Sequence, residues 1–342
     1  MTDPLRHQGQ SGDVGHKEAR ASRTPTPSIA VIGLGAMGMG TARALLDAGF
    51  AVTGCDINPK ALREFAAAGG KTAASPAEAA RDASVILLIV VNADQVESVL
   101  FGEAGVLNAS DSDTPSGRLG PKPVILQNAT VPPAYAEALA GRMPDGVEIL
   151  DAPISGGALK ARAGELSVMA SGTANAFDRA QSVLDTMAAT VHNLGNRCGP
   201  GSSMKLVNQL LAGVHISAAA EAMALGLRMG IDARTIYNVI TASAGNSWMF
   251  ENRMAHVLDG DYTPRSAIEI FVKDLGIVTQ TGRDLRFPVP LSAAAQQQFT
   301  AAAAAGLGRE DDAAVIKVFE RLAGIQLPSA ANDSNASSGA SH

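Results

Sequence analysis

The sequence predicts an α/β fold in which an N-terminal, Rossmann-like, doubly wound sheet is followed by an all-α C-terminal domain. Three observations predict it. Short apolar runs alternate with helical stretches over 28–194, a glycine-rich turn follows the first run, and strand signals stop after Gly201. Such alternation is typical of a parallel sheet flanked by helices. The 342 residues suffice for two domains at about 100 to 200 residues each.

Six short apolar runs are the expected strands. They are 29–32, 51–55, 85–90, 124–126, 148–150 and 190–193. Apolar residues at helical spacing then predict five helices in the C-terminal half. They are 203–229, 232–242, 266–284, 291–305 and 311–321. The expected domains are therefore 28–194 and 195–327, and ligands favour the cleft between two such domains.

Three polar segments lie outside this pattern. Residues 1–27 have mixed charge without an apolar centre, and 328–342 is rich in Ser, Asn, Gly and Ala. We expect both to be disordered, because neither can bury enough apolar surface to fold. The polar stretch 108–123 is longer than a usual connection, so we expect a surface insertion there.

The composition excludes several classes of protein. With 46% hydrophobic residues and a net charge of -6, the chain is globular and offers no positive field to nucleic acid. No apolar run reaches the roughly 18 residues needed to span a bilayer, so we expect a soluble protein without a membrane partner. Cys55 and Cys198 are too few for a disulfide framework or a thiolate metal cluster. This indicates a reducing, cytoplasmic setting and no metal.

The stretch 31–42, VIGLGAMGMGTA, places three glycines in GxGxxG spacing between a strand and a helix. There the first glycine allows a tight turn, the second lets a pyrophosphate approach the backbone, and the third lets helix and strand pack closely. The helix N-terminus supplies free N–H groups to phosphates. The expected cofactor-binding turn consists of Gly33, Leu34, Gly35, Ala36, Met37 and Gly38.

Asp56 follows the second expected strand, where a carboxylate accepts hydrogen bonds from the adenosine ribose. It repels a 2′-phosphate, and neither Ile57 nor Asn58 supplies a guanidinium, so NAD is favoured over NADP. Val91, near the end of a later strand, is also expected at the cofactor, and Thr130, at another strand end, is placed to contact either cofactor or substrate. The alternative is an ordinary strand-to-helix turn with Asp56 starting the next helix.

A lysine is the best candidate for the proton acceptor that a nicotinamide enzyme needs. Lys205 lies in the first turn of an apolar helix, with Asn208 and Gln209 on its face. The apolar residues around this polar stripe are Met204, Val207, Leu210, Leu211 and Val214. We expect them to desolvate the ammonium and lower its pKa. A surface lysine at a frayed helix start is the alternative, and His215, on the same apolar helix, is better explained as a core histidine.

Two further stretches carry candidate polar groups. In Ser155-Gly156-Gly157, open backbone N–H groups and a hydroxyl can bind a carboxylate, although this is equally good turn chemistry. Lys273 and Asp274 lie among apolar residues. Either they form a buried ion pair or Lys273 faces the cofactor cleft, and a solvated pair on a helix is the alternative.

These motifs resemble those of the β-hydroxyacid dehydrogenases, which include 3-hydroxyisobutyrate dehydrogenase and tartronate semialdehyde reductase. GLGAMG, DAPISGG, CGPGSSMKLVNQ and KDL occur in the family's order and approximate spacing. The resemblance implies that Lys205 is the catalytic acid/base, that Thr130 and Lys273 lie at the cofactor, and that the protein is a homodimer or homotetramer. It also implies a substrate site that consists of Ser155, Gly156, Gly157 and Asn208, to which we add Gln209.

Within this family, residues 245–278 and the stretch QLLAGVHI most resemble the branch that oxidises the four-carbon sugar acid L-threonate at C2. Its extra hydroxyls would need polar partners such as Lys160, Gln209 or Asn246. Asn208 followed by Gln209 instead resembles tartronate semialdehyde reductase. A 3-hydroxyisobutyrate dehydrogenase is a further alternative, as is a non-catalytic NAD-binding sensor. A last alternative is an imine reductase, a class that resembles this architecture but usually has another residue in place of the lysine. Lys205 argues against it.

Overall fold

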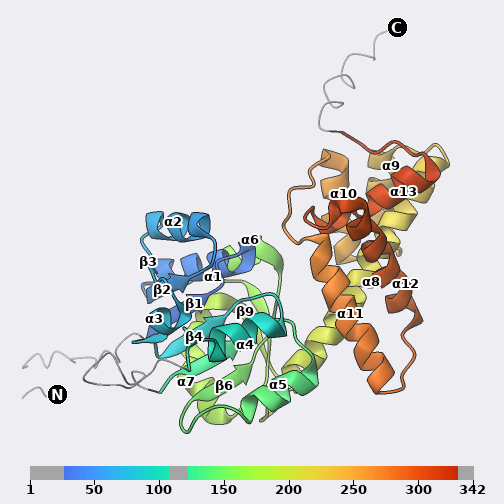
Figure 1. Ribbon diagram of the computed structural model, residues 1–342. Helices are drawn as coiled ribbons and strands as arrows, with labels where there is room; N and C mark the ends of the chain where they lie inside the picture. Colours follow the sequence, from blue (N-terminus) through green and yellow to red (C-terminus); the bar gives the residue numbers. More distant parts are fainter. Residues whose placement is uncertain (1–26, 108–121, 330–342) are drawn as a thin grey trace, which may run out of the picture.

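The computed structural model describes residues 27–107 and 122–329. A sheet unit (27–107 and 122–199) is followed by a helical unit (200–329), and helix α8 joins them (Figure 1). The expected α/β architecture with an all-α C-terminal part is confirmed. The expectations for 1–26, for 108–121 and for 330–342, two disordered tails and an insertion, lie outside the described residues.

The sheet unit contains all six expected strands and three that the sequence did not indicate, β3, β7 and β8. In chain order its elements are β1 (Ser28–Ile32), α1 (Ala36–Asp47), β2 (Ala51–Cys55), α2 (Pro59–Ala67), β3 (Lys71–Thr72), α3 (Pro76–Ala80), β4 (Val85–Leu88), α4 (Ala93–Phe101), β5 (Val124–Gln127), α5 (Pro133–Ala140), β6 (Glu148–Asp151), β7 (Ile154–Ser155), α6 (Gly157–Ala163), β8 (Leu166–Ala170), α7 (Ala174–Met187) and β9 (Ala188–Asn193).

The main sheet has the strand order β3-β2-β1-β4-β5-β6, and every pair in it is parallel. Alternate residues of β1 belong to different cores: Ile29 and Val31 pack with α1 and α7, and Ala30 and Ile32 pack with α3, α4 and α5. Both faces are therefore covered, as a parallel sheet requires. The strand order reverses between β1 and β4, which is where such folds bind ligands at the carboxyl ends of their strands.

The expected strand 190–193, now β9, belongs to a separate small sheet with the order β7-β8-β9. A bridge between Asp151 and Ser171 connects the end of β6 to this second sheet. The loop between β6 and β7 therefore lies at the junction of the two sheets.

The helical unit contains the five expected helices, with shifted ends, and one that was missed. In chain order its elements are α8 (Pro200–Arg228), α9 (Ala233–Thr241), α10 (Trp248–Asp259), α11 (Ile268–Asp284), α12 (Pro290–Ala302), the π-helix η1 (Ala303–Leu307), the 3-10 helix η2 (Asp312–Ile316) and α13 (Lys317–Ala323). The missed helix, α10, has a local signal. Ser247 caps its N-terminus, and Phe250, Met254 and Val257 are buried at helical spacing.

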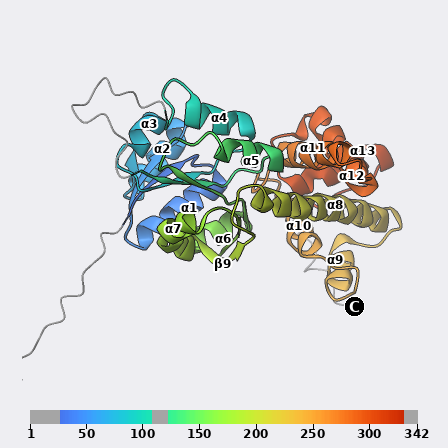
Figure 2. The same ribbon diagram turned by 90° about the horizontal axis from the view of Figure 1, so that it is seen from below.

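Helix α8 corrects the expectation that no apolar segment is long enough to span a bilayer. Among the described residues it is the one helix that is long and apolar enough by length and composition. It runs from the sheet unit along α11 and α12 (Figure 2). Half of its most apolar window is buried, and its buried side chains include Lys205 and Gln209. These contacts are those of a core helix.

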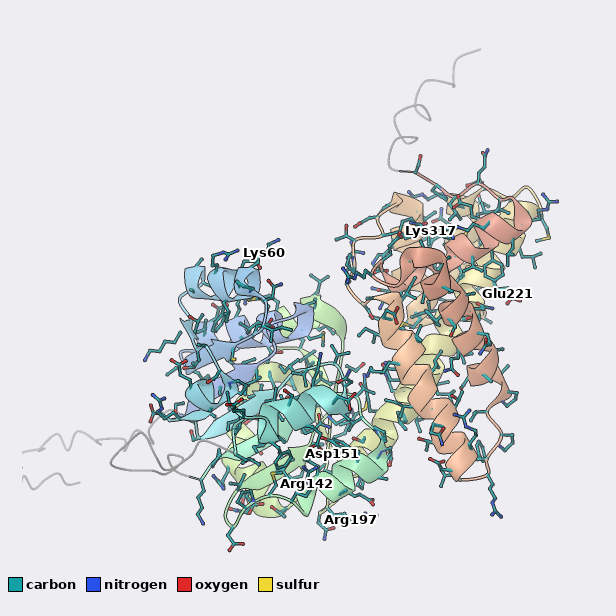
Figure 3. All side chains as sticks on the ribbon, in the orientation of Figure 1. Lys60, Arg142, Asp151, Arg197, Glu221 and Lys317 are labelled. Atoms are coloured by element: carbon teal, nitrogen blue, oxygen red, sulfur yellow. The ribbon has the colours of Figure 1, made fainter. Side chains whose placement is uncertain are left out.

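The start of α8 is fixed to the sheet unit by the buried carboxylate of Asp151 (Figure 3). Its Oδ2 accepts hydrogen bonds from the backbone N–H groups of Gly199 (2.9 Å) and Ser202 (2.8 Å), and its Oδ1 accepts one from the Ser202 hydroxyl (2.6 Å). Burial raises the pKa of Asp151, although these hydrogen bonds oppose the rise. A side chain of β6 thus caps a helix that begins about fifty residues later.

We predict that Asp151→Ala lowers the free energy of unfolding by about 3 kcal/mol or more, because it leaves buried N–H donors without an acceptor. Asn92→Ala is the matched control, since Asn92 caps the more exposed helix α4 through Gln95 N–H (2.9 Å), and it should cost about 1 kcal/mol. Urea unfolding measures both. Equal losses would show that the Asp151 cap has no special role.

Candidate active site

The glycine turn after β1 has the geometry that a dinucleotide needs. Gly33 has φ +96°, and a Cβ there would lie 2.2 Å from the carbonyl oxygen of Ile89. A Cβ on Gly38 would lie 1.8 Å from the carbonyl oxygen of Gly33, so helix α1 and the turn pack without side chains between them. The space beside Gly35 is open, and α1 begins there without a side-chain cap. Backbone N–H groups therefore stay available for phosphate.

Asp56, at the end of β2, is fixed beside this turn. Its Oδ2 accepts a hydrogen bond from Leu34 N–H (2.6 Å), and its Oδ1 accepts one from Asn58 N–H (2.7 Å). The next side chain, Ile57, is 98% exposed and offers no positive charge. The arrangement fits an adenosine ribose without a 2′-phosphate.

The other two residues expected at the cofactor also follow strands of the main sheet. Val91 is half-exposed after β4, and its N–H donates to Oε1 of Gln95 (2.7 Å). Thr130 follows β5, and its carbonyl oxygen accepts a hydrogen bond from Nζ of Lys273 (3.1 Å). A lysine of α11 in the helical unit therefore reaches the strand ends of the sheet unit.

Lys205 is buried. The structure therefore favours a desolvated lysine over the alternative of a surface lysine at a frayed helix start. Its side chain is 7% exposed, and its Nζ donates to the carbonyl oxygen of Ile154 (2.8 Å). Burial lowers the pKa of Lys205 to about 8. The negative charge of Asp274 opposes this shift, and the positive charge of Lys273 adds to it. The amine can therefore exchange a proton near neutral pH.

The predicted cause of this desolvation was only partly right. Met204, Val207 and Leu211 are 44%, 55% and 49% exposed, so they do not enclose the amine. Lys205 instead donates to the carbonyl oxygen of Ile154 of β7, and the charged pair Lys273 and Asp274 on α11 acts on it electrostatically. The residues beside a helical position in sequence point to other faces of the helix, which is why the local apolar pattern misled.

Directly after Ile154, the Ser155-Gly156-Gly157 turn adopts a backbone that favours glycine. Gly156 has φ +136° and Gly157 has φ +80°. A Cβ on Gly156 would lie 3.1 Å from Cβ of Lys160, so that lysine side chain lies against the turn. A lysine side chain and a glycine-favouring turn therefore occur in one short segment next to the residue that Lys205 contacts.

A chain of polar side chains links α8 and α11. Nδ2 of Asn208 donates to Oε1 of Gln209 (2.9 Å), Nε2 of Gln209 donates to Oδ2 of Asp274, and Oδ1 of Asp274 lies 2.6 Å from Nζ of Lys273. Lys273 thus forms the ion pair that was one of the alternatives, and its Nζ also contacts Thr130 in the sheet unit. By contrast, the hydrogen bonds of Asn246 go to Thr241 and Glu251, within the helical unit.

The sequence did not predict the contacts of two carboxylates near the site. Asp151 stood out only as part of the motif DAPISGG, and Asp274 only as a partner of Lys273. The sequence held one signal for Asp151. It is an acidic residue at the end of a buried strand, and such a carboxylate can cap a later helix that begins with serines. For Asp274 the polar neighbours Asn208 and Gln209 on another helix gave no indication of contact.

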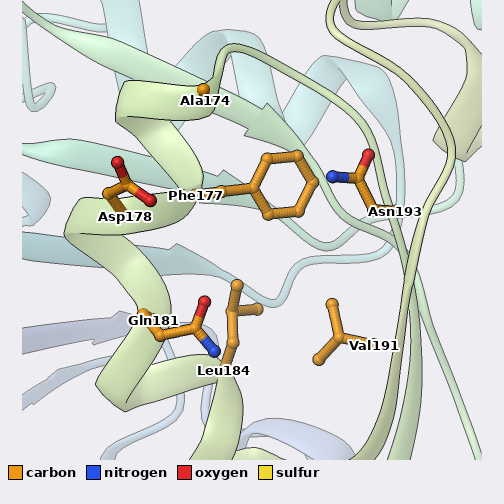
Figure 4. Close-up of a pocket in the computed structure, with 7 residues that line it drawn as sticks. All are labelled: Ala174, Phe177, Asp178, Gln181, Leu184, Val191 and Asn193. Atoms are coloured by element: carbon orange, nitrogen blue, oxygen red, sulfur yellow. The ribbon is translucent and has the colours of Figure 1, made fainter.

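A separate hollow of about 360 Å³ lies between α7 and β9 (Figure 4). Its lining consists of Ala174, Phe177, Asp178, Gln181, Leu184, Val191 and Asn193. None of these belongs to the glycine turn, the lysine site or the Ser155 turn, so this hollow is not part of the candidate active site. Within 27–107 and 122–329, no group of three or more His, Cys, Asp and Glu side chains is placed to hold a metal ion.

Two family models match the chain in sequence. The NAD-binding domain of 6-phosphogluconate dehydrogenase matches residues 28–195, and the NAD-binding domain of NADP-dependent 3-hydroxyisobutyrate dehydrogenase matches 199–319. Together with the glycine turn, they identify an NAD-binding protein.

The chain is also similar to individual proteins. An L-threonate dehydrogenase of Cupriavidus necator is 55% identical over 88% of this chain and 98% of its own length, and one of Escherichia coli K12 is 48% identical over 88% and 97%. A crystal structure of 3-hydroxyisobutyrate dehydrogenase from Salmonella typhimurium superposes with a TM-score of 0.78 at 48% identity, covering 85% of this chain and 99% of that one. The chain belongs to the family of β-hydroxyacid dehydrogenases related to 3-hydroxyisobutyrate dehydrogenase, and it is an NAD-dependent hydroxyacid dehydrogenase.

Proposed function

We propose that this enzyme oxidises L-threonate at C2, with NAD as the hydride acceptor, to give the 2-oxo acid 2-dehydro-L-erythronate. The observation that carries the proposal is the buried amine of Lys205, which donates to the carbonyl oxygen of Ile154 in β7, at the junction of the two sheets. The identity of 48–55% to named L-threonate dehydrogenases supports the choice of acid. A 3-hydroxyisobutyrate dehydrogenase or a tartronate semialdehyde reductase is the alternative.

Lys205 acts as the proton acceptor in this proposal. A neutral amine has two N–H donors and one lone pair, and the carbonyl oxygen of Ile154 takes one donor (2.8 Å). This contact limits rotation of the amine and leaves the lone pair for the substrate hydroxyl. Bound NAD supplies the electrophilic carbon that receives the hydride. In the reverse direction the ammonium returns the proton to the carbonyl oxygen of the product.

The substrate carboxylate is proposed to dock on the Ser155-Gly156-Gly157 turn. Its backbone N–H groups, the Ser155 hydroxyl and the nearby Lys160 supply donors of the right charge. Asn208 lies one turn after Lys205 on α8 and holds another polar group of the acid. Gln209 uses both ends of its amide within the protein, so we assign it to the support of Asn208.

For NAD, we propose contacts with Gly33–Gly38, Asp56, Val91, Thr130 and Lys273. We also propose a homodimer or homotetramer in the cytoplasm, built on the exposed apolar side of α8. Supporting this, Met204, Val207, Leu211 and Leu225 of that helix are each exposed by 44% or more. Exposed apolar residues along one helix favour burial against another subunit. The two domains are proposed at 28–194 and 195–327.

Lys205→Met should lower kcat for L-threonate oxidation by about 10²- to 10⁴-fold while NAD binding is kept, because general base catalysis is lost. In the native enzyme kcat/KM should rise with pH around a midpoint near 8, where Lys205 becomes neutral. Stopped-flow NADH absorbance against pH measures both. Lys71→Met, an exposed lysine on β3, is the control. Near-normal turnover of Lys205→Met would remove the lysine from the mechanism.

Among L-threonate, D-erythronate, 3-hydroxyisobutyrate and D-glycerate, we expect L-threonate to have the highest kcat/KM. The others should be at least about tenfold lower, since each leaves a polar group of the site unpaired or misplaced. Initial rates of NADH formation test this order. A flat trace with every acid, despite NAD binding, would favour a sensor, and a preference for 3-hydroxyisobutyrate would favour that alternative.

The double change Asp56→Ser with Ile57→Arg should raise the ratio of kcat/KM for NADP over NAD by about tenfold or more. It removes a charge that repels the 2′-phosphate and adds a guanidinium that binds it. Ile57→Leu alone should leave the preference for NAD unchanged. If the double variant keeps the native preference, Asp56 does not select the cofactor.

A further inference from the structure

The buried chain that links Asn208, Gln209 and Asp274 has a definite polarity. Gln209 is 7% exposed and Asp274 is 1% exposed, so water does not compete for their hydrogen bonds. Oδ1 of Asp274 also lies 2.6 Å from Nζ of Lys273, and the two side chains form an ion pair. A carboxylate only accepts hydrogen bonds, whereas each amide has one donor end and one acceptor end.

This polarity fixes the orientation of both amides. Because Asp274 only accepts, Gln209 must turn its NH₂ group toward it, and its Oε1 then faces Asn208. Asn208 must in turn use its own NH₂ group toward Gln209 (2.9 Å). Its Oδ1 is left over, and no donor among the described residues forms a hydrogen bond to that oxygen. The carboxylate of Asp274 thus determines which atom Asn208 offers.

We propose that Asp274 is a positioning residue, which through Gln209 turns Asn208 so that Oδ1 accepts a hydrogen bond from a substrate hydroxyl. The reacting hydroxyl gives its hydrogen to Lys205. The donor that meets Asn208 is therefore a neighbouring hydroxyl, such as the one on C3 of a polyhydroxy acid. The inference rests on the proposed function, because it assigns the reacting hydroxyl to Lys205.

The charge of Asp274 gives a second, independent effect. The charged groups that act on Lys205 are Asp274 and Lys273, both on α11, while β7 contributes only the carbonyl group of Ile154. Asp274 raises the pKa of Lys205 and thereby opposes the effect of burial. Removing the charge should move the acid limb of the pH profile for oxidation to lower pH. A residue that only supports the fold would leave the midpoint of that limb in place.

The test reverses the direction of the hydrogen bonds that link positions 208, 209 and 274. In Asn208→Asp, a carboxylate faces Oε1 of Gln209, which cannot turn because Asp274 holds its NH₂ group. Adding Asp274→Asn lets Gln209 turn, so that the new amide at position 274 donates to it and it donates to the new carboxylate at position 208. Each single variant should lose about tenfold or more in kcat/KM for L-threonate at its pH optimum. The double variant should recover at least about tenfold over Asn208→Asp alone. Together with the tenfold loss in Asp274→Asn, this is a coupling of about 2.8 kcal/mol.

Two substrates that differ only in the hydroxyl on C3 test the proposed contact of that hydroxyl with Asn208. For 2,4-dihydroxybutyrate, the 3-deoxy analogue of L-threonate with the same configuration at C2, Asp274→Asn should reduce kcat/KM several-fold less than it does for L-threonate. Gln209→Met breaks the chain without altering a charge, and it should show the same selective loss if Asp274→Asn does not fold. Thermal melting and NAD binding confirm the fold of each variant.

Additive losses in the double variant, or equal losses for the two acids, would overturn the inference. An unchanged pH midpoint in Asp274→Asn would refute the electrostatic effect. These outcomes differ from failure of the proposed function, which shows as retained activity in Lys205→Met or as no activity with any hydroxy acid.

Discussion

The geometry of the whole site depends on the buried carboxylate of Asp151. It holds the first turn of α8 against the end of β6, and three residues later on the same segment the carbonyl group of Ile154 holds the amine of Lys205. The Ser155-Gly156-Gly157 turn follows at once. One short stretch of backbone therefore sets the origin of the reactive helix, the orientation of its lysine and the proposed anion-binding turn.

The chemistry of Lys205 results from two opposing effects. Burial disfavours the ammonium, as does the positive charge of Lys273, whereas the negative charge of Asp274 favours it, and the pKa falls from 10.5 to about 8. Asp274 and Lys273 act on the amine with opposite signs, so their ion pair adds little net charge to the site. A lone carboxylate in that place would raise the pKa of Lys205, and a lone cation would lower it further. The pair keeps the amine in a range where it can both take and return a proton.

The sequence predicted those parts of the molecule whose signal is local. Patterns of only a few residues predicted the glycine turn, Asp56 and the six strands. The polar face around Lys205 was predicted in the same way. Asp151 and Asp274 act on residues 51 and 65 positions away, and no local pattern indicates such partners. The same limit explains why Met204, Val207 and Leu211 were wrongly expected to desolvate Lys205. The sequence shows that they are hydrophobic, but it does not show which side of α8 the fold covers.

The contacts that order the site also join the two units. Lys205 and Lys273, on α8 and α11, donate to the carbonyl groups of Ile154 and Thr130 in the sheet unit. Both lysines therefore lose their orientation if the units separate, whereas each unit keeps its own apolar core. Because these two hydrogen bonds lie outside the two apolar cores, a weakened junction should impair catalysis before it unfolds the protein. Lys205 and Lys273 thus serve two roles at this junction: the proposed chemistry and the attachment of the helical unit to the sheet unit.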